Sequence, residues 1–342
     1  MNATPMPACP TVSPQWSAAP LDAVVRSAQE LCAVLRRTDD NRPAPDLSRM
    51  DRVLRLDERR GLVEVQAAVR WTDLAAFLVD AGIHAGRAFA DAAEHGLPAT
   101  IGDCVSRNPA APDGSPFVGH VESLAIVGAD GELRCASRSR HPDWFRAVNG
   151  GQGLIAAVYS ITLHLDTLER AFADAGPVAR FPVAGSREDR TEGAIRLMVP
   201  PAGLDAFLAA LRAAFEDYRL PIAGLSVRRT TADAETLLRW ATEELAVVDV
   251  SFPEPVTLPG RVAATQVRKM LIAAALAHGG RFDLATGMEA SREQVEAAYP
   301  MFSAFLAAKR RHDPQQRLSG PWFRHYEALF RREPLEVRWS RA

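Results

Sequence analysis

The chain has 342 residues, of which 47% are hydrophobic, and a formal net charge of −2. This length and apolar content allow two domains with a substantial core, and the charge balance argues against nucleic acid as a partner. The four cysteines show no CxxC pair or metal-ligand spacing, and the longest apolar run, residues 270–277, is too short to cross a bilayer. We therefore expect a soluble, cytoplasmic protein with reduced thiols and no membrane span.

The first quarter of the chain predicts a helix followed by a strand pair and a second helix. Residues 1–20 are proline-rich and lack the charged start and apolar segment of a secretory signal, so we expect a flexible tail. Apolar residues recur at helical intervals over 21–37, and the interval TDDNRPAP (38–45) is a loop by composition. The elements predicted next are strands at 53–56 and 62–69 and a helix at 71–81.

Residues 97–165 hold the densest series of turns. A loop rich in Gly, Asn and Pro leads into a strand at 121–127. After a turn at Asp130-Gly131 come a second strand, a short aromatic helix around Trp144, the run GGQG (150–153) and a strand at 158–165. Glycines at strand ends let backbone amides approach a ligand closely. From spacing alone, the alternative is a set of tight turns in an α+β domain.

The second half of the chain alternates between strand and helix patterns. Residues 166–189 form a polar connector with Gly and Pro, which suggests a domain junction. Such alternation over one sheet predicts an antiparallel α+β domain. The predicted strands are 194–199, 222–229 and 245–252, and the predicted helices are 204–218, 232–239 and 262–278.

Several separate pieces of the chain resemble the flavin-binding core of the vanillyl-alcohol oxidase and p-cresol methylhydroxylase (PCMH) superfamily. The branch with alditol oxidases and decaprenylphosphoryl-ribose oxidase is the most similar. That family has TIGG, an Asn or Asp before His-Gly, a GDHV turn, ADGE, P-x-LFWA and GGxGLxGV in this order. The matching residues here are Thr100-Ile101-Gly102-Asp103, Asn108, Gly119-His120-Val121, Ala129-Asp130-Gly131-Glu132, Pro142-Asp143-Trp144-Phe145 and Gly150-Gly151-Gln152-Gly153.

The resemblance covers about residues 20–326 and implies a two-domain α+β protein of the PCMH-type flavin-oxidase fold. The implied units are a flexible tail (1–20), an FAD-binding-like domain (21–170), an α+β substrate or cap domain (190–298) and a closing segment (299–342) that returns to the first domain. It also implies FAD, bound non-covalently. The implied cofactor-binding residues are Thr100, Ile101, Gly102, Asp103, Cys104, Ser106, Asn108, Gly119, His120, Val121, Gly153, Ala157 and Val158.

Three features depart from the family pattern. Between the first helix and DLSRM (46–50), the family places a strand and a glycine-rich loop whose amides hold the FAD pyrophosphate; here TDDNRPAP fills the interval without a glycine. Asp103 stands where the family has a glycine, and Pro109-Ala110 replace His-Gly. The alternative that these differences leave open is a retained scaffold with an eroded cofactor site.

The candidate catalytic residues are Asp283 and His120. Asp283 and Thr286 match the strand positions where the family branch carries a Tyr and a Lys, and Asp283 is the potential base. The alternatives are a solvated carboxylate for Asp283 and a structural hydrogen bond for His120. Arg228, Arg229, Arg239 and Arg324-His325 are candidates for binding an anionic group, while Lys309, Arg310 and Arg311 are expected at the surface. The histidines show no metal-binding motif.

Two functions are consistent with these patterns. The first is an FAD-dependent oxidoreductase that oxidises a small alcohol or polyol-like substrate. The second is a flavin-free relative that binds a ligand or catalyses a non-redox step in the interdomain cleft, because a fold does not determine a function. The missing phosphate loop, Asp103 and Thr286 favour the second, and the preserved scaffold fits both. The oligomeric state is not indicated.

Overall fold

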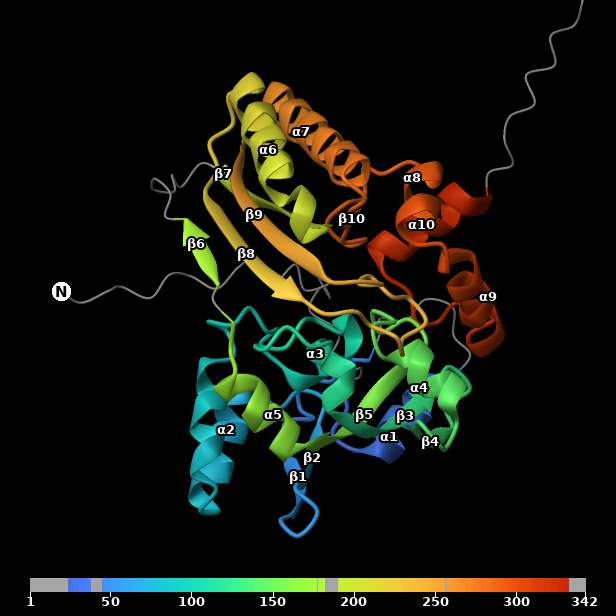
Figure 1. Ribbon diagram of the computed structural model, residues 1–342. Helices are drawn as coiled ribbons and strands as arrows, with labels where there is room; N and C mark the ends of the chain where they lie inside the picture. The colour runs from blue at the N-terminus through green and yellow to red at the C-terminus, as the bar shows by residue number, and fades with distance from the viewer. Residues whose placement is uncertain (1–23, 38–44, 177, 182–189, 256, 332–342) are drawn as a thin grey trace, which may run out of the picture.

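The computed structural model describes residues 24–37, 45–176, 178–181, 190–255 and 257–331. The predicted tail (1–20), most of TDDNRPAP and the end of the closing segment lie outside these residues. The described chain forms two five-stranded antiparallel sheets with helices packed on them, one above the other in Figure 1. The prediction of an α+β fold is confirmed.

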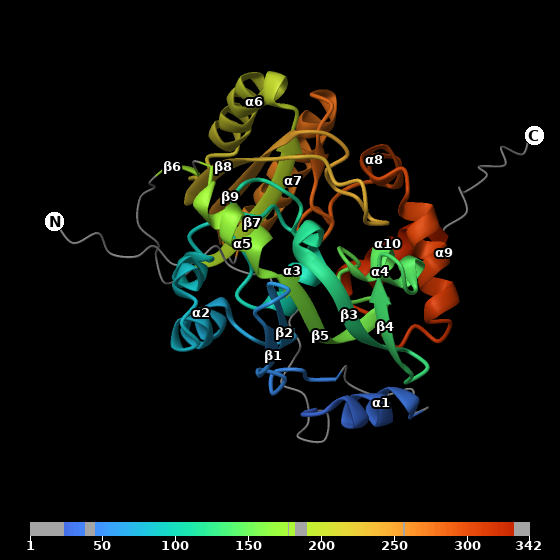
Figure 2. The same cartoon turned by 60° about the horizontal axis from the view of Figure 1, so that its bottom comes forward.

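The first sheet has the strand order β1-β2-β5-β3-β4. Both faces of its central strands are packed: Val63, Val65 and Ile161 join the main core, while Val127 and Ala157 pack beneath the N-terminal helix. Figure 2 shows this helix, α1, on the side of the sheet away from the second sheet. The elements are α1 (Ala28–Arg36), β1 (Val53–Asp57), β2 (Leu62–Gln66), α2 (Trp71–Asp80), α3 (Ile101–Arg107), β3 (Val121–Gly128), β4 (Leu133–Ser137), α4 (Pro142–Val148), β5 (Ala156–His164) and α5 (Leu165–Ala173), with 3-10 turns η2 (His84–Asp91) and η3 (Phe117–His120).

The second sheet has the order β10-β7-β9-β8-β6, and α6 and α7 cover one of its faces (Figure 1). The side chains of Ile195, Leu197 and Val248 face these helices and join the main core. Arg196, between the first two, faces the other way, toward the first sheet, because successive side chains in a strand alternate. The elements are β6 (Ala179–Phe181), β7 (Arg190–Val199), η4 (Pro201–Gly203), α6 (Leu204–Asp217), β8 (Gly224–Thr230), β9 (Leu245–Pro255), α7 (Leu258–Ala277) and β10 (Arg281–Phe282).

Three C-terminal helices connect the two sheets along one side of the molecule (Figure 1). They are α8 (Arg292–Ala298), α9 (Phe302–His312) and α10 (Pro321–Arg331). The ammonium group of Lys309 on α9 is buried and donates to the carbonyl of Leu154 at 2.7 Å, to that of Leu318 at 2.5 Å and to the carboxylate of Asp313. The expectation that Lys309 lies at the surface is therefore wrong, whereas Arg310 and Arg311 are exposed.

Three other local predictions are wrong. Residues 101–107, expected as a loop, form α3, because Thr100 caps the helix by accepting from the amide of Asp103 at 3.2 Å. The polar connector begins instead with α5, whose Leu168 and Phe172 lie at helical spacing and are buried. Residues 232–239, expected as a helix, are irregular because the carboxylate of Asp233 accepts hydrogen bonds from the distant Asn108 and from the amide of Glu235. Among the described helices, none is long and apolar enough to span a bilayer.

Candidate functional site

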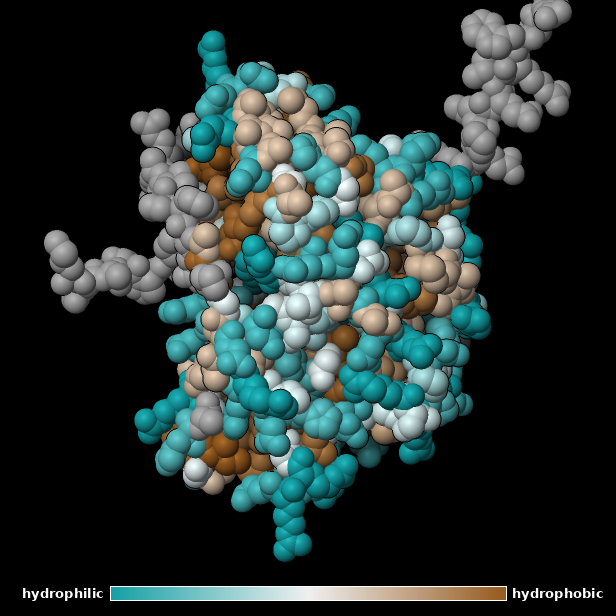
Figure 3. Space-filling model, in the orientation of Figure 1, coloured by the Kyte–Doolittle hydropathy of each residue, from teal (hydrophilic) through white to brown (hydrophobic). Residues whose placement is uncertain are grey.

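A small pocket lies between the two sheets, and we call it the inter-sheet pocket. Its free volume is about 30 Å³, which holds about two or three water molecules. On the face seen in Figure 3, the surface between the two sheets is mostly hydrophilic or neutral. The pocket is lined by Arg107, Pro109, Ala110, Gly150, Gln152, Arg196, Met198, Arg228, Leu238, Trp240, Val247, Asp283, Leu284 and Tyr299.

The first sheet contributes the end of α3 and the glycine-rich loop before β5. The amides of Gly150 and Gln152 each donate at 2.8 Å to the last turn of α3, to the carbonyls of Val105 and Ser106. These hydrogen bonds connect the loop to the helix, so the part of the pocket lining that the two contribute is fixed. Arg107 is the last residue of α3 and reaches the pocket from this end.

The second sheet contributes charged side chains from three neighbouring strands. Arg196 on β7 lies opposite Asp249 on β9, and its Nε donates to Oδ1 of Asp249 at 2.5 Å. Arg228 on β8 reaches the same carboxylate at 3.6 Å and donates to the carbonyl of His95 at 2.9 Å. Burial raises the pKa of Asp249, but the two guanidinium groups outweigh burial and hold the pKa below its usual value. Asp249 is therefore ionised at neutral pH.

The end of β10 places Asp283 at the pocket, as expected for a candidate base. One oxygen of its carboxylate accepts from the amides of Ala285 and Thr286 at 3.1 and 3.0 Å. The hydroxyl of Thr286 accepts a hydrogen bond from the backbone amide of Arg196 at 3.1 Å. The hydroxyl of Tyr299 donates to the carbonyl of Phe282 at 2.5 Å, and burial raises the pKa of Tyr299. Asp283 is thus the carboxylate in the lining of the pocket.

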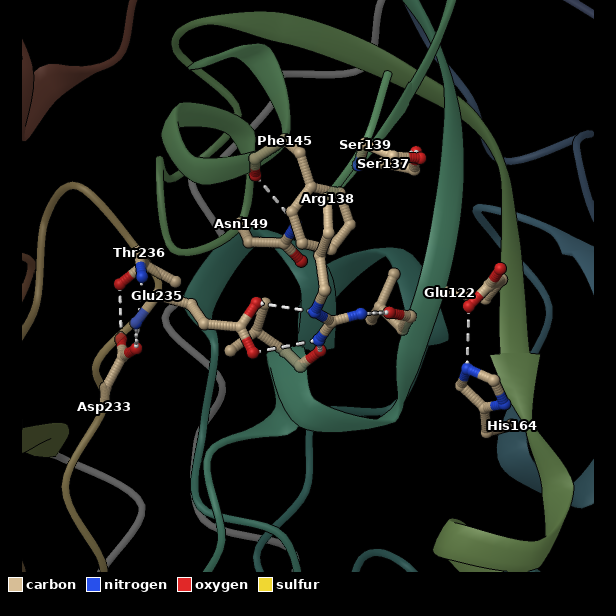
Figure 4. Close-up of polar contacts among 12 residues, drawn as sticks. Glu122, Ser137, Arg138, Ser139, Phe145, Asn149, His164, Asp233, Glu235 and Thr236 are labelled. Carbon is tan, nitrogen blue, oxygen red and sulfur yellow. Dashed lines mark hydrogen bonds and ion pairs between the residues drawn. The ribbon is translucent and has the colours of Figure 1, made fainter. Parts of the chain in front are cut away.

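Residues 231–244, between β8 and β9, dock onto the first sheet at the pocket; we call them the docking segment. The buried carboxylate of Asp233 accepts from Nδ2 of Asn108 at 2.9 Å and from the amide and hydroxyl of Thr236. Trp240 donates from Nε1 to the carbonyl of Asn108 at 2.9 Å. Figure 4 shows Glu235 of this segment paired with Arg138, with Nε at 2.9 Å from the carboxylate. The docking segment therefore joins the two sheets beside the pocket.

The predicted cofactor-binding residues at the start of α3 instead pack the helix against the end of β2. Ile101 and Gly102 donate to the carbonyls of Val69 and Ala67 at 3.0 and 2.8 Å. A Cβ on Gly102 would lie 2.5 Å from the carbonyl oxygen of Ala67. Cys104 is buried, and burial raises the pKa of its thiol. Close packing of the helix therefore explains why a glycine stands at position 102.

The structure does not gather the other predicted cofactor-binding residues around one cavity. Asp103 and Ser106 are half-buried on α3, Gly119 and Gly153 are exposed, and Val121 is a core residue. Ala157 and Val158 point to opposite faces of β5 and belong to different hydrophobic clusters. Among the predicted catalytic and cofactor-binding residues, only Asp283 lines the inter-sheet pocket.

His120 lies away from the pocket lining, at the junction of η3 and β3. Its Nε2 contacts the hydroxyl of Ser115 at 3.1 Å, and its Nδ1 contacts that of Thr167 at 3.0 Å. Ser115 in turn donates to the carboxylate of Asp113 at 2.6 Å. The structure does not bring His120 and Asp283 together in one site.

The environment of His120 predicts a loss of stability in mild acid. Burial lowers the pKa of His120 below the ordinary value of 6.5, and Asp113 opposes this only in part. Because the pKa of His120 is lower in the folded state than in the unfolded state, the neutral ring stabilises the fold. This stabilisation is complete above pH 6.5 and is lost as the pH falls through the pKa of the folded state. Urea unfolding at about pH 7.5 and about pH 5.5 measures the effect. Between these pH values the free energy of unfolding should fall more for the wild type than for His120→Gln.

His312 is the matched control, because burial and Arg311 also lower its pKa. A His312→Gln variant should keep the decrease in the free energy of unfolding at acid pH that is due to His120. Equal acid sensitivity of the wild type and His120→Gln would show that the ring is not buried in its neutral form.

The pocket is also lined by Arg107, Arg196 and Tyr299, which were not singled out from the sequence. Arg228 was a candidate for binding an anionic group, and Gln152 was named as part of the GGQG run. Arg196 carried a usable signal, since a charged residue between Ile195 and Leu197 interrupts an apolar strand. The other candidate cations lie elsewhere: Arg229 is exposed and pairs with Glu244, and Arg324 and His325 are exposed on α10. Within the described residues, no group of three metal-binding side chains is found.

The sheet and helix arrangement around α3 can now be compared with known proteins. Residues 45–137 match the family model of an FAD binding domain. The match supports FAD binding and a PCMH-type fold, and it suggests a flavin-dependent oxidoreductase. It begins at the last residue of the interval (38–45) in which the phosphate-binding loop was expected. No curated protein matches the chain.

The described residues do not accommodate a flavin ring in the inter-sheet pocket as it stands. A free volume of about 30 Å³ is far smaller than a tricyclic ring system needs. The side chain of Asn108 is engaged by Asp233 and by the amide of Val118, at 2.8 Å, and is not directed to a cofactor. FAD at this pocket would therefore require movement of its lining, to which the docking segment contributes Leu238 and Trp240.

Proposed function

We propose that the protein is a flavin-dependent oxidoreductase that acts on a small alcohol or polyol-like substrate and holds FAD without a covalent bond. The match of residues 45–137 to an FAD binding domain carries this proposal. Asp283 is the proposed base, because it lines the inter-sheet pocket and is half-buried. His120 is not part of the proposed machinery, since its ring lies between two hydroxyl groups elsewhere.

Purified protein should be tested first for flavin by its visible spectrum, and then by titration with FAD while flavin fluorescence is followed. Asp103, in the first turn of α3, places a carboxylate where the related family has a glycine. Under the proposal, Asp103→Ala should tighten FAD binding by about fivefold, because it removes one like charge near the diphosphate. Asp73→Ala is the matched control, since Asp73 lies in the first turn of α2. A colourless protein that does not bind FAD even when FAD is in excess would contradict the proposal.

A second candidate function is a flavin-free protein that binds a small ligand in the same pocket. The observation that favours it is the small free volume of the pocket, beside which the docking segment is held by the buried carboxylate of Asp233. In this case neither Asp103→Ala nor release of the docking segment would produce FAD binding. The titration above therefore separates the two functions.

A further inference from the structure

A second and larger pocket lies on the face of the first sheet that turns away from the main core, and we call it the outer-face pocket. Its free volume is about 180 Å³, against about 30 Å³ for the inter-sheet pocket. Pockets that hold drug-sized molecules are larger, at roughly 300–1,000 Å³. The outer-face pocket therefore has the size for a small organic molecule.

Four of its lining residues form one row straight across four strands. Arg55 on β1 is paired with Glu64 on β2. Glu64 is also paired with Thr162 on β5, and Thr162 is paired with Ser123 on β3. Directly paired residues in an antiparallel sheet place their side chains on the same face. Since Val63, the neighbour of Glu64, points into the main core, the whole row lies on the opposite face.

The outer-face pocket is separate from the inter-sheet pocket, and the two share no lining residue. Asp57 and Arg60 also line the outer-face pocket, which places it beside the turn between β1 and β2. Figure 1 shows this turn at the end of the molecule away from the second sheet. A ligand in this pocket would therefore not occupy the proposed substrate site.

The lining holds five charged side chains, and three of them are already paired. The guanidinium group of Arg55 lies 3.6 Å from the carboxylate of Asp57. The carboxylate of Glu122 contacts Nε2 of His164 at 2.9 Å, and Figure 4 shows the two side chains directed toward each other. Two charged groups of the lining remain.

The remaining two groups are Glu64 and Arg60, which have opposite charges. Glu64 is half-buried, and its carboxylate accepts a hydrogen bond from the neutral hydroxyl of Ser160 at 2.7 Å. Arg60 is exposed, and its guanidinium group forms no ion pair or hydrogen bond within the part of the chain that the structure describes. One carboxylate and one guanidinium group are thus available in the same pocket.

The hydroxyl groups of Thr162 and Ser123 add two acceptors in the row beside Glu64. Both residues are half-buried, and neither hydroxyl is hydrogen-bonded to another described residue. An alkylammonium group has three donors and no acceptor, which matches one carboxylate and two hydroxyl oxygens. A guanidinium group binds a carboxylate through two parallel hydrogen bonds. The pocket therefore offers partners for both ends of a zwitterion.

We propose that the outer-face pocket binds a small polar α-amino acid, with its ammonium group toward Glu64 and its carboxylate toward Arg60. Seven of the eight lining residues are polar, Leu62 being the exception, which favours a polar side chain on the ligand. This binding goes beyond the proposed oxidoreductase function, because it requires neither flavin nor a redox step.

L-Serine, glycerate and serinol test the need for both charges, because the three molecules have nearly the same shape. Glycerate has a hydroxyl in place of the ammonium group, and serinol has a hydroxymethyl group in place of the carboxylate. Calorimetric titration of the purified full chain should show L-serine binding at least about tenfold more tightly than either analogue. Equal affinity for the three, or no binding of L-serine, would overturn the proposal and leave a solvated sheet face.

Replacement of Glu64 by glutamine tests the position of the ammonium group. Glu64→Gln should weaken L-serine binding by about tenfold and leave glycerate binding unchanged, since it removes the charge but keeps an acceptor for Ser160. Glu58→Gln is the matched control, because Glu58 is exposed in the β1–β2 turn and does not line the pocket. A Glu64→Gln variant that binds L-serine as the wild type does would overturn the site.

Replacement of Arg60 by glutamine tests the position of the carboxylate. Arg60→Gln should weaken L-serine binding by about tenfold and leave serinol binding unchanged. Arg59→Gln is the matched control, since Arg59 is the exposed neighbour in the same turn but is not in the lining. Circular dichroism checks that all variants are folded. Equal effects of Arg60→Gln and Arg59→Gln would show that only the general charge of the turn acts, and would reject this position.

The flavin proposal can fail separately. Colourless protein that does not bind FAD but binds L-serine with the expected selectivity would retain the amino-acid site and reject the flavin function. Protein that binds FAD but does not distinguish L-serine from glycerate and serinol would do the reverse.

Discussion

Replacement of Lys309 by methionine is expected to lower the free energy of unfolding by about 3–5 kcal/mol. The side chains of Lys309 and Asp313 are 1% and 0% exposed, and the ammonium group uses its three donors on Leu154, Asp313 and Leu318. Methionine has a similar length but leaves the buried carboxylate without its cation. Two carbonyl groups also lose their donor. Urea unfolding followed by circular dichroism measures the effect.

Arg310→Met is the matched control, because Arg310 is the exposed neighbour of Lys309 on α9. Its effect should stay within about 0.5 kcal/mol. Asp313 retains hydrogen bonds from the amides of Arg317 and Leu318 at 2.9 and 2.8 Å, so the variant should remain folded in the absence of urea. A Lys309→Met effect as small as that of Arg310→Met would mean that the ion pair is open to water.

Replacement of Asp233 by alanine is expected to cost about 2–4 kcal/mol and to release the docking segment from the first sheet. The carboxylate of Asp233 accepts from the side chains of Asn108 and Thr236 and from the amides of Glu235 and Thr236, at 2.8 and 3.1 Å. Alanine leaves these buried donors unpaired. Hydrogen exchange should therefore become faster across residues 231–244 than across the strands that flank them.

Glu235→Ala is the control within the same segment. It removes the half-exposed pair with Arg138 but keeps the buried contacts, so its cost should stay below about 1 kcal/mol. If the docking segment excludes flavin, Asp233→Ala should also bind FAD more tightly than Glu235→Ala. Unchanged exchange across 231–244 in Asp233→Ala would show that Trp240 and its neighbours hold the segment without the carboxylate.

Local periodicity was sufficient for much of the secondary structure. Helix α2 spans Trp71–Asp80 against a prediction of 71–81, and α6 spans Leu204–Asp217 against 204–218. β3 and β9 begin at the predicted residues Val121 and Leu245. In the two helices, one face is buried and the other is not, so the sequence carries the 3.6-residue repeat directly. β9 is buried on both faces from Leu245 to Val248, and its continuous apolar run indicates a strand.

Periodicity failed where a distant partner determined the conformation. The pattern of residues 232–239 indicated a helix, but Asp233 binds Asn108, a residue 125 positions away, and the backbone follows that contact. Lys309 begins a basic run that continues with the exposed Arg310 and Arg311, and its burial depends on the carbonyl of Leu154. Such contacts leave no repeat in the local sequence.

The sequence by itself determined the α+β class, the antiparallel second sheet and the resemblance of the segment around α3 to an FAD binding domain, because these depend on short-range pattern and motif order. Only the tertiary structure decided which residues form the pocket. Arg107, Arg196 and Arg228 come from separate elements, and no spacing in the chain indicates that they converge. The volume between them depends on how the docking segment packs across the two sheets, which is a property of the folded chain alone.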